Sequence, residues 1–393
     1  MGVAVSGGGD SVALLVLLAD WGRADLRVAT VDHGLRAEAA DEARQVAALC
    51  ADLGIPHDIL RWSGWDGQGN LPDQARRARY ALMADWATSH DLNDIVLGHT
   101  SDDQAETFLM RLARAAGLDG LSAMAAVRDV SGVRFHRPLL GVTRELLRDF
   151  LRGRNICWAE DPSNEDNTFE RVRIRKLLAD LGPHGITGTG LAQVADQLRE
   201  ARDALNGYVL QDARRIVGFY HGDLLIDNDG VHSVTPEALR RVVKTGLIWV
   251  SGADYPPRGE ALERLLSAIR SGQDMTLGGC RVLARPEGVR ITREWKAVAE
   301  MRVPVGTLWD GRWQFEGPVQ DGLEIAALGE AGLAHCPDRK ATGRPAASLM
   351  ASPALWEGPR VISAPLAGLK NGWQARLMRG PEAFFSRLAG NSV

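Results

Sequence analysis

The sequence predicts an α/β protein whose first domain is a Rossmann-like parallel sheet. Short β-rich runs alternate with helical patterns through the N-terminal part of the chain. The expected strands are 3–5, 26–31, 57–60 and 95–97, and the expected helices are 12–18, 38–53, 71–86 and 104–112. Strict alternation implies right-handed βαβ crossovers, and therefore a parallel sheet covered by helices on both faces.

Helical patterns continue after this sheet, and they end at a glycine-rich stretch that is typical of a linker. The helices are expected at 145–151 and 171–181, and the linker at 182–190. We therefore predict a first domain over residues 1–185.

Two further domains are expected in the rest of the chain. A long helix (191–219), a hairpin (224–234), two helices (236–250 and 260–269) and strands within 275–292 predict a small α+β middle domain over residues 186–298. Irregularly spaced Gly, Pro and Trp residues after Met301 predict short strands and loops, which gives a β-rich C-terminal domain over residues 299–393.

The composition excludes several classes of protein. With 45% hydrophobic and 24% charged residues and no long apolar run, the chain is expected to be cytoplasmic, with no contact to a membrane. No charged region precedes the first apolar run, so we expect no signal peptide. The four cysteines are far apart and form neither a CxxC motif nor a dense disulfide framework. The net charge of −4 does not argue against a local basic face that binds nucleic acid.

Chemistry is expected beyond the carboxyl ends of the strands, where ligands bind in sheets of this type. The first such segment is Ser6, Gly7, Gly8, Gly9, Asp10 and Ser11. Glycines let a backbone approach a ligand closely, and the N-terminus of the following helix attracts phosphate. An acid beside phosphate is repulsive unless a cation lies between them, so Asp10 suggests a Mg²⁺ ion. The alternative is a tight turn in which Asp10 or Ser11 caps the helix.

The other two strand ends are also polar. Asp32 and His33 follow the second strand, where they are expected to contact ribose or an incoming substrate, or to form an ordinary helix-entry loop. The third segment contains Gly98, His99, Asp102, Asp103 and Glu106. Its acids share one end of a helix in which Ser101 or Asp102 is the expected cap, and they suit Mg²⁺, a cationic substrate or a general base.

The first loop resembles the SGGxDS signature of the PP-loop ATP pyrophosphatases at every fixed position. The three segments together resemble the bacterial tRNA(Ile)-lysidine synthases. That resemblance continues through residues 137–140, 161–164 and 171–175, and covers residues 2–178. The later regions resemble the substrate-binding domains of this family in order and length only.

The resemblance implies an ATP-dependent ligase. In that family the wobble cytidine of tRNA(Ile) with a CAU anticodon is adenylated at O2, and the amine of free L-lysine then displaces AMP. Ser6 to Ser11 are then expected to bind ATP, and Asp10 and Asp103 to hold Mg²⁺. Catalytic roles fall to Asp10, Glu106 and Arg171, and substrate contacts to Asp32, His33, Gly98, His99, Asp102, Asp103 and Arg175.

Two departures from the family pattern are visible. The family usually carries Asn directly after Arg171, where this chain has Val172. The chain also begins only five residues before Ser6, so we expect the first strand to lack its usual preceding segment.

Several alternatives stay open at this stage. A tRNA-thiolating PP-loop enzyme would need reactive or cluster-binding cysteines, and another adenylating synthetase would not need the later domains. A non-catalytic RNA-binding protein with a decayed loop conflicts with the intact motifs. Arg76, Arg77 and Arg79 fit either a tRNA-contacting face or ordinary surface, and a homodimer is one hypothesis for the oligomeric state.

Overall fold

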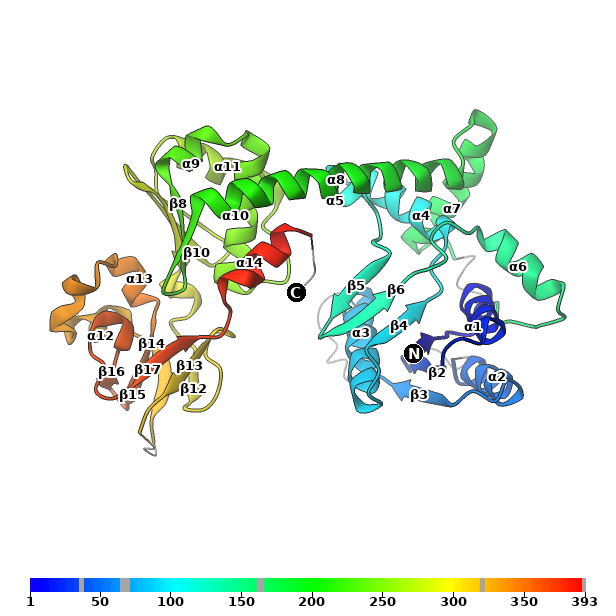
Figure 1. Cartoon of the computed structure of the whole chain (residues 1–393), viewed down its shortest axis with the longest axis horizontal. Coiled ribbons are helices and arrows are strands. Elements are labelled where there is room, and N and C mark those ends of the chain that lie inside the picture. The colour runs from blue at the N-terminus through cyan, green and yellow to red at the C-terminus, as the bar shows by residue number, and fades with distance from the viewer. Residues whose placement is uncertain (35–38, 64–70, 161–165, 319–321, 391–393) are drawn as a thin grey trace. The chain divides into compact units, whose positions relative to one another are not determined.

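The computed structural model describes residues 1–34, 39–63, 71–160, 166–318 and 322–390. The chain forms two compact units, Met1–Ala204 and Leu205–Gly390. The boundary falls inside one long helix, α8 (Gly188–Ile216), which contributes residues to both (Figure 1). The division into three domains stays a prediction. Among the described helices, none is long and apolar enough to cross a membrane.

The N-terminal unit is built on a six-stranded sheet in the order β3-β2-β1-β4-β6-β5. The strands are β1 (Gly2–Ala4), β2 (Arg27–Asp32), β3 (His57–Arg61), β4 (Asp94–Leu97), β5 (Val127–Val130) and β6 (Val133–His136). All neighbours are parallel except β5 and β6, so the predicted parallel sheet is confirmed. The chain moves outward from β1 to β3 and then returns to the other side of β1 with β4. This reversal places the carboxyl ends of β1 and β4 at the switch point where such sheets bind ligands.

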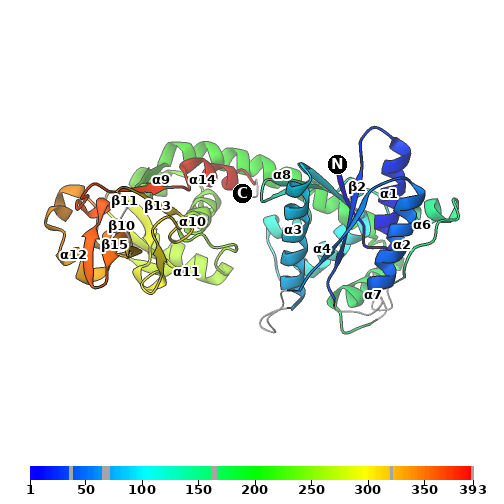
Figure 2. The same cartoon turned by 90° about the horizontal axis from the view of Figure 1, so that it is seen from below.

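Helices cover both faces of the sheet, as Figure 2 shows. On one face lie α1 (Gly9–Trp21), α2 (Ala39–Asp52) and α6 (Arg144–Arg152), which share a core with β1. On the other face α3 (Leu71–Ser89) packs Tyr80, Met83 and Trp86 against β2, β4 and β6. Three further helices, α4 (Ser101–Leu112), α5 (Leu118–Leu121) and α7 (Glu170–Leu181), complete the unit.

The hairpin of β5 and β6 was not predicted. Its turn consists of Ser131 and Gly132, both with positive φ (53° and 81°), which is the geometry of a tight two-residue hairpin turn. Of the two strands, only Val133–His136 alternates apolar with polar residues, since the other reads Val-Arg-Asp-Val, so the strand pattern in the sequence is weak. It is short, and only pairing of β6 with β4 buries Val133 and Phe135.

The C-terminal unit contains three antiparallel sheets. The first has the order β7-β8-β11-β10-β9, the second β12-β14-β15-β16, and the third pairs β13 with β17. The strands are β7 (Val217–Tyr220), β8 (Asp223–Asp227), β9 (Met275–Leu277), β10 (Cys280–Arg285), β11 (Gly288–Arg293), β12 (Arg302–Pro304), β13 (Trp313–Glu316), β14 (Glu324–Ala327), β15 (Pro353–Glu357), β16 (Arg360–Ser363) and β17 (Gln374–Leu377). The expected richness in β structure toward the C-terminus is confirmed.

Helices of the C-terminal unit pack against these sheets. They are α9 (Asn228–Ser233), α10 (Pro236–Ser251), α11 (Gly259–Arg270), α12 (Gly329–Ala334), α13 (Ala346–Met350) and α14 (Pro381–Leu388). The largest core joins α10, α11 and α14 to the first sheet. Trp309, Trp313 and Trp373 are buried together in a second core, so the scattered tryptophans of this region are structural.

Two sequence predictions of local structure were wrong. Residues 182–190 are not an open linker, because a 3₁₀ turn (Gly182–His184) precedes α8, which begins at Gly188. The hairpin expected at 224–234 is instead formed by β7 and β8, with the turn at His221 and Gly222, and α9 occupies the second half of the expected range. In the first case the glycines of the stretch were interpreted as a linker, although Gly188 and Gly190 belong to the first turn of α8.

We predict that the anchoring of α6 to α1 depends on Leu151, which is 0% exposed, and not on Leu146, which is 61% exposed on the same helix. Leu151→Ala should lower the free energy of opening of α1 and α6 by about 2–5 kcal/mol, because it removes a fully buried side chain. Amide hydrogen exchange measures this quantity. Leu146→Ala is the control and should change it by less than about 0.5 kcal/mol; equal effects of the two substitutions would contradict the assigned packing.

Candidate active site

The glycine-rich loop connects β1 to α1 and is closed by its own serines. Gly7 has φ of +91°, and Gly8 caps the N-terminus of α1 through its backbone. The Ser11 hydroxyl donates to the Gly8 carbonyl at 2.9 Å and accepts from the Ser6 N–H at 3.1 Å. Neither Asp10 nor Ser11 caps the helix, and the Ser11 hydroxyl holds the loop in shape. The Ser11 and Val12 N–H groups donate to the Gly8 carbonyl at 3.1 and 3.0 Å, which leaves the N–H groups of Gly9 and Asp10 at the start of α1 to bind an anion.

A distant segment flanks the same loop. The Ala159 N–H donates to the Gly7 carbonyl at 2.9 Å, which makes a parallel bridge between Gly8 and Ala159. A side chain at Gly9 would begin 3.4 Å from the ring of Trp158. The chain after α6 thus forms one wall beside the loop.

Gly98, directly after β4, approaches the start of α1 closely. A Cβ atom there would lie 2.9 Å from both the Asp10 carbonyl oxygen and the Ser11 Cα. These are backbone atoms that cannot move without displacing the loop. The absence of a side chain at position 98 therefore allows the ends of β1 and β4 to approach each other at the switch point. This close approach explains why the residue is glycine.

The helix after Gly98 begins with a capping box, not with the cap expected from the sequence. Thr100 is the N-cap of α4, and the Asp103 carboxylate accepts from the Thr100 N–H at 2.9 Å and from its hydroxyl at 3.1 Å. Asp102 accepts from the Arg144 N–H at 2.8 Å, so it satisfies the N-terminus of α6. The prediction that Ser101 or Asp102 caps α4 was wrong, because Thr100 and Asp103 form the two reciprocal hydrogen bonds of the box and start the helix one residue earlier.

Three carboxylates from two helices meet at the guanidinium of Arg144. Its Nε lies 3.0 Å from Asp10 Oδ2, and its two terminal nitrogens lie 3.4 Å from Asp103 Oδ1 and 3.4 Å from Glu106 Oε1. The side chain of Glu106 is 1% exposed, and Arg175 contacts the same Oε1 at 2.5 Å. The acid cluster expected near the loop is present, and it is partly neutralised by two arginines.

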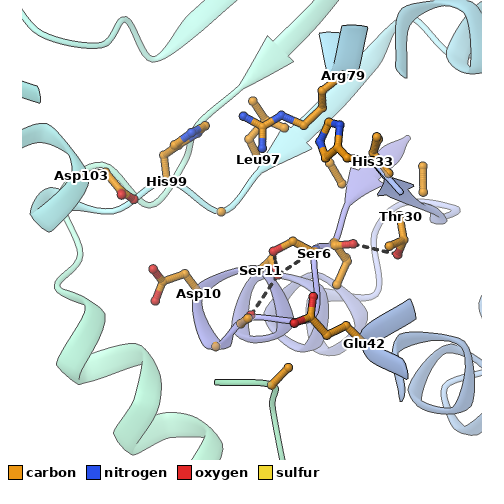
Figure 3. Close-up of a pocket in the computed structure, with 18 of the residues that line it drawn as sticks. Ser6, Asp10, Ser11, Thr30, His33, Glu42, Arg79, Leu97, His99 and Asp103 are labelled. Carbon is orange, nitrogen blue, oxygen red and sulfur yellow. Dashed lines mark hydrogen bonds between the residues drawn. The ribbon is translucent and has the colours of Figure 1, made fainter. Parts of the chain in front are cut away.

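A cavity of about 780 Å³ lies between the loop and this cluster. Its volume is within the range of roughly 300–1,000 Å³ that is usual for ligand sites. Figure 3 shows Ser6, Asp10 and Ser11 on one side, with His99, Asp103 and Arg79 across from them. Of the residues predicted for the site, ten line the cavity: Ser6, Gly8, Gly9, Asp10, Ser11, His33, Gly98, His99, Asp103 and Arg175.

Five predicted site residues do not line the cavity: Gly7, Asp32, Asp102, Glu106 and Arg171. Asp32 accepts from the Gly34 N–H at 2.9 Å, as in the helix-entry alternative. Glu106 lies behind Arg144 and Arg175, which contact it and do line the cavity. Leu35, Arg36 and residues 161–164 of the family motifs lie outside the described residues.

Burial and nearby charges control ionisation in the cavity. Burial raises the pKa of Asp10, although Arg144 opposes this shift. Burial acts in the same sense on Asp103, but Arg144 and the Thr100 N–H outweigh it and lower the pKa of Asp103. Burial also lowers the pKa of His99 to about 4, so its ring is neutral at physiological pH.

Sequence reasoning missed Arg144 and did not assign Arg79 to the site. Arg144 is the first residue of α6, where the helix dipole disfavours a cation. This unfavourable position was the available signal. Arg79 lines the cavity, and burial lowers its pKa, with Arg76, Arg171 and Arg137 adding to the effect. No sequence pattern separates Arg79 from the neighbouring arginines on α3, because only the packing of the helix decides which of them faces inward.

Comparison with known proteins identifies the family. Residues 1–181 match the PP-loop domain family. The chain is 52% identical to the tRNA(Ile)-lysidine synthase of Ruegeria pomeroyi over 99% of this chain and 93% of that protein. The chain belongs to the tRNA(Ile)-lysidine synthase family. It is 40% identical to the synthase of Hyphomonas neptunium over 72% of this chain and 79% of that protein, and 34% identical to that of Brucella anthropi over 92% and 84%.

Family membership also bears on Val172, which stands where the family usually has Asn. Val172 is 5% exposed on α7, so this position is used for packing here.

We predict that Gly98→Ala disables the loop, because the new methyl group would displace the backbone of Asp10 and Ser11. ATP-dependent pyrophosphate release should fall by roughly tenfold to a hundredfold, as expected for a shift of about 1 Å in a reacting group. A pyrophosphate-release assay measures this. Gly182→Ala is the control, since nothing lies within 4 Å of its position. Full activity of Gly98→Ala would refute the close-approach role.

Proposed function

We propose that this protein ligates L-lysine to C2 of the wobble cytidine in a CAU-anticodon tRNA(Ile), with ATP as the activating substrate. The observation that carries this proposal is the meeting of an anion-binding loop and a carboxylate cluster in one cavity. The loop suits the phosphates of ATP, and the carboxylates suit the amine of lysine. The relatives are tRNA(Ile)-lysidine synthases, which supports tRNA(Ile) as the substrate and lysidine as the product.

ATP fits the cavity with its phosphates at the loop. The N-terminus of α1 offers the N–H groups of Gly9 and Asp10 and the positive end of its dipole. The wall formed by Ala4, Ala29, Val31, Met83 and Leu97 is apolar and suits an adenine ring. The partly buried side chain of Arg79 lines the same space, and its guanidinium would pair with an anionic phosphate there.

Mg²⁺ fits the donor set at the loop. Asp10 Oδ1 is buried and makes no hydrogen bond with any residue in the described ranges. Asp103, which the sequence also suggested as a Mg²⁺ ligand, is assigned to the lysine amine, because one of its oxygens belongs to the capping box and the other faces Arg144. No group of three or more potential ligands occurs among the described residues. Mg²⁺ commonly uses one or two carboxylates together with substrate phosphates, and would neutralise charge as pyrophosphate leaves.

The chain's own residues account for two chemical steps. In the first, cytidine O2 attacks the α-phosphorus, the bond to the bridging oxygen breaks, and pyrophosphate leaves while the loop N–H groups stabilise the charge. In the second, the lysine amine attacks C2, the C2–O2 bond breaks, and AMP leaves with its electron pair. Asp103 and Glu106 would hold the ammonium and accept the proton that the amine must lose.

A tRNA-thiolating activity is the nearest alternative, and the cavity disfavours it. Sulfur transfer to an adenylated base needs a cysteine or a cluster near the base. None of the described residues that line the cavity is a cysteine. Cys50, Cys280 and Cys336 are buried, and burial raises the pKa of Cys50 to about 11. Cys157 is exposed, but it does not line the cavity.

The proposal predicts lysine transfer by the purified protein. Given ATP, Mg²⁺ and labelled lysine, it should label CAU-anticodon tRNA(Ile) and release AMP and pyrophosphate. Omission of Mg²⁺ should stop pyrophosphate release. Arginine and ornithine serve as competing amines. Absence of label, or equal transfer of the other amines, would refute the proposal.

Two substitutions should separate the two steps. Asp10→Asn should reduce pyrophosphate release by roughly a hundredfold while tRNA binding persists, because the carboxylate acts on the phosphates and not on the tRNA. Glu106→Gln should allow pyrophosphate release but let adenylated tRNA accumulate, because the amine is no longer held and deprotonated. Rapid-quench analysis of labelled ATP and tRNA measures both. The exposed Asp149, paired with Arg152, provides Asp149→Asn as a control. Normal lysidine yield in Glu106→Gln would remove Glu106 from the second step.

A further inference from the structure

Arg144 joins two parts of the cavity that the proposed function uses at different steps. Asp10 belongs to the phosphate half, whereas Asp103 and Glu106 belong to the amine half. One guanidinium, with its side chain 18% exposed, contacts all three carboxylates. Its contact with Asp10 is the closest, at 3.0 Å, and its contacts with the other two acids are 3.4 Å each.

The position of Arg144 is set by a hydrogen bond of its backbone and by the packing of its helix. Thr143 caps α6, and the Arg144 N–H donates to Asp102 at 2.8 Å. Leu147 and Leu151 bury the opposite side of the helix against α1. Because a cation at a helix N-terminus is unfavourable, the acids must compensate for its placement. The side chain is long and has one edge in the cavity, so it can change partners while its backbone stays fixed.

The cluster has more carboxylates than guanidinium groups, so it would favour another cation if Arg144 moved away. Three carboxylates, those of Asp10, Asp103 and Glu106, face two guanidinium groups, those of Arg144 and Arg175. In addition, Glu106 Oε2 is buried and has no hydrogen-bond partner within the described residues. If Arg144 moved to a phosphate, Asp103 and Glu106 would lose a cation and would favour another in its place.

We propose that Arg144 occupies the amine subsite when no nucleotide is bound, and that the phosphates draw it away and open that subsite to lysine. Guanidinium groups pair with phosphate through two parallel hydrogen bonds, which makes the exchange favourable. Lysine binding then requires a bound nucleotide, so the amine arrives only when there is an activated group to attack. Arg144 is therefore a positioning residue, and this inference rests on the proposed function.

The test measures lysine binding without catalysis. Equilibrium dialysis with labelled lysine is performed on the full chain, alone and with Mg²⁺ and the α,β-methylene analogue of ATP. The analogue should strengthen lysine binding in the parent protein by about 5-fold to 150-fold, the usual range of coupling between two sites. In Arg144→Gln, lysine should bind without nucleotide, and the analogue should have little further effect.

Two further variants keep the result interpretable. Arg154→Gln removes a surface arginine that pairs with Asp20 and does not line the cavity, so it should retain the coupling of the parent. Arg144→Lys keeps the charge in case Arg144→Gln does not fold, as judged by circular dichroism. A point charge on a shorter stem cannot serve all three acids, so this variant should show weaker coupling than the parent.

The outcomes separate this inference from the proposed function. If the parent binds no lysine under either condition, both fail. If lysine binds and the analogue strengthens its binding equally in the parent and in the Arg144 variants, only the role of Arg144 is overturned. If the analogue weakens or does not change lysine binding in the parent, the exchange proposed here is wrong, although lysine remains a substrate.

Discussion

The site depends on the neutralisation of three carboxylates, two of them buried and one partly buried, by arginines from other helices. Asp10 lies on α1, Asp103 and Glu106 on α4, Arg144 on α6 and Arg175 on α7, so four helices meet through charge. Loss of one partner from a buried pair costs about 3–5 kcal/mol, since the remaining charge is left uncompensated. This cost ties the placement of α6 and α7 to the loop, even though these helices contribute few other groups to the cavity.

A second constraint is the closeness of two backbones at the switch point. β1 and β4 are neighbours in the sheet, and the chain leaves them in different directions. Gly98 brings the end of β4 against the first turn of α1, while the bridge from Ala159 holds the loop on its other side. The anion-binding N–H groups are therefore oriented by backbone contacts from two separate segments. Such preorganisation suits a loop whose task is to stabilise charge as it develops on phosphate.

The C-terminal unit uses buried charge in a different way. Asp310 pairs with Arg293 and Arg312, and Asp223 pairs with Arg290 and Arg344, with most of these side chains nearly inaccessible. The Asp223–Arg290 pair lies within the first sheet, between β8 and β11, whereas Asp310 joins β11 to the turn before β13, and Arg344 joins the segment before α13 to β8. They are remote in sequence from the motifs of the N-terminal unit, and no sequence pattern indicates that these residues pair.

The sequence by itself determined the parallel sheet, the anion-binding loop and the gathering of acids near it. Those features depend on local patterns: alternating strands and helices, glycines at a strand end, and acids within one helical turn. Tertiary structure alone decided that Asp103 closes a capping box with Thr100, that Arg144 meets three acids, and that Arg79 faces the cavity. The physical reason for Arg144 and Arg79 is that their surroundings consist of residues far away in the sequence, which only folding brings near. For Thr100 and Asp103 the reason is that several neighbouring residues could cap the helix, and only the folded structure decides among them.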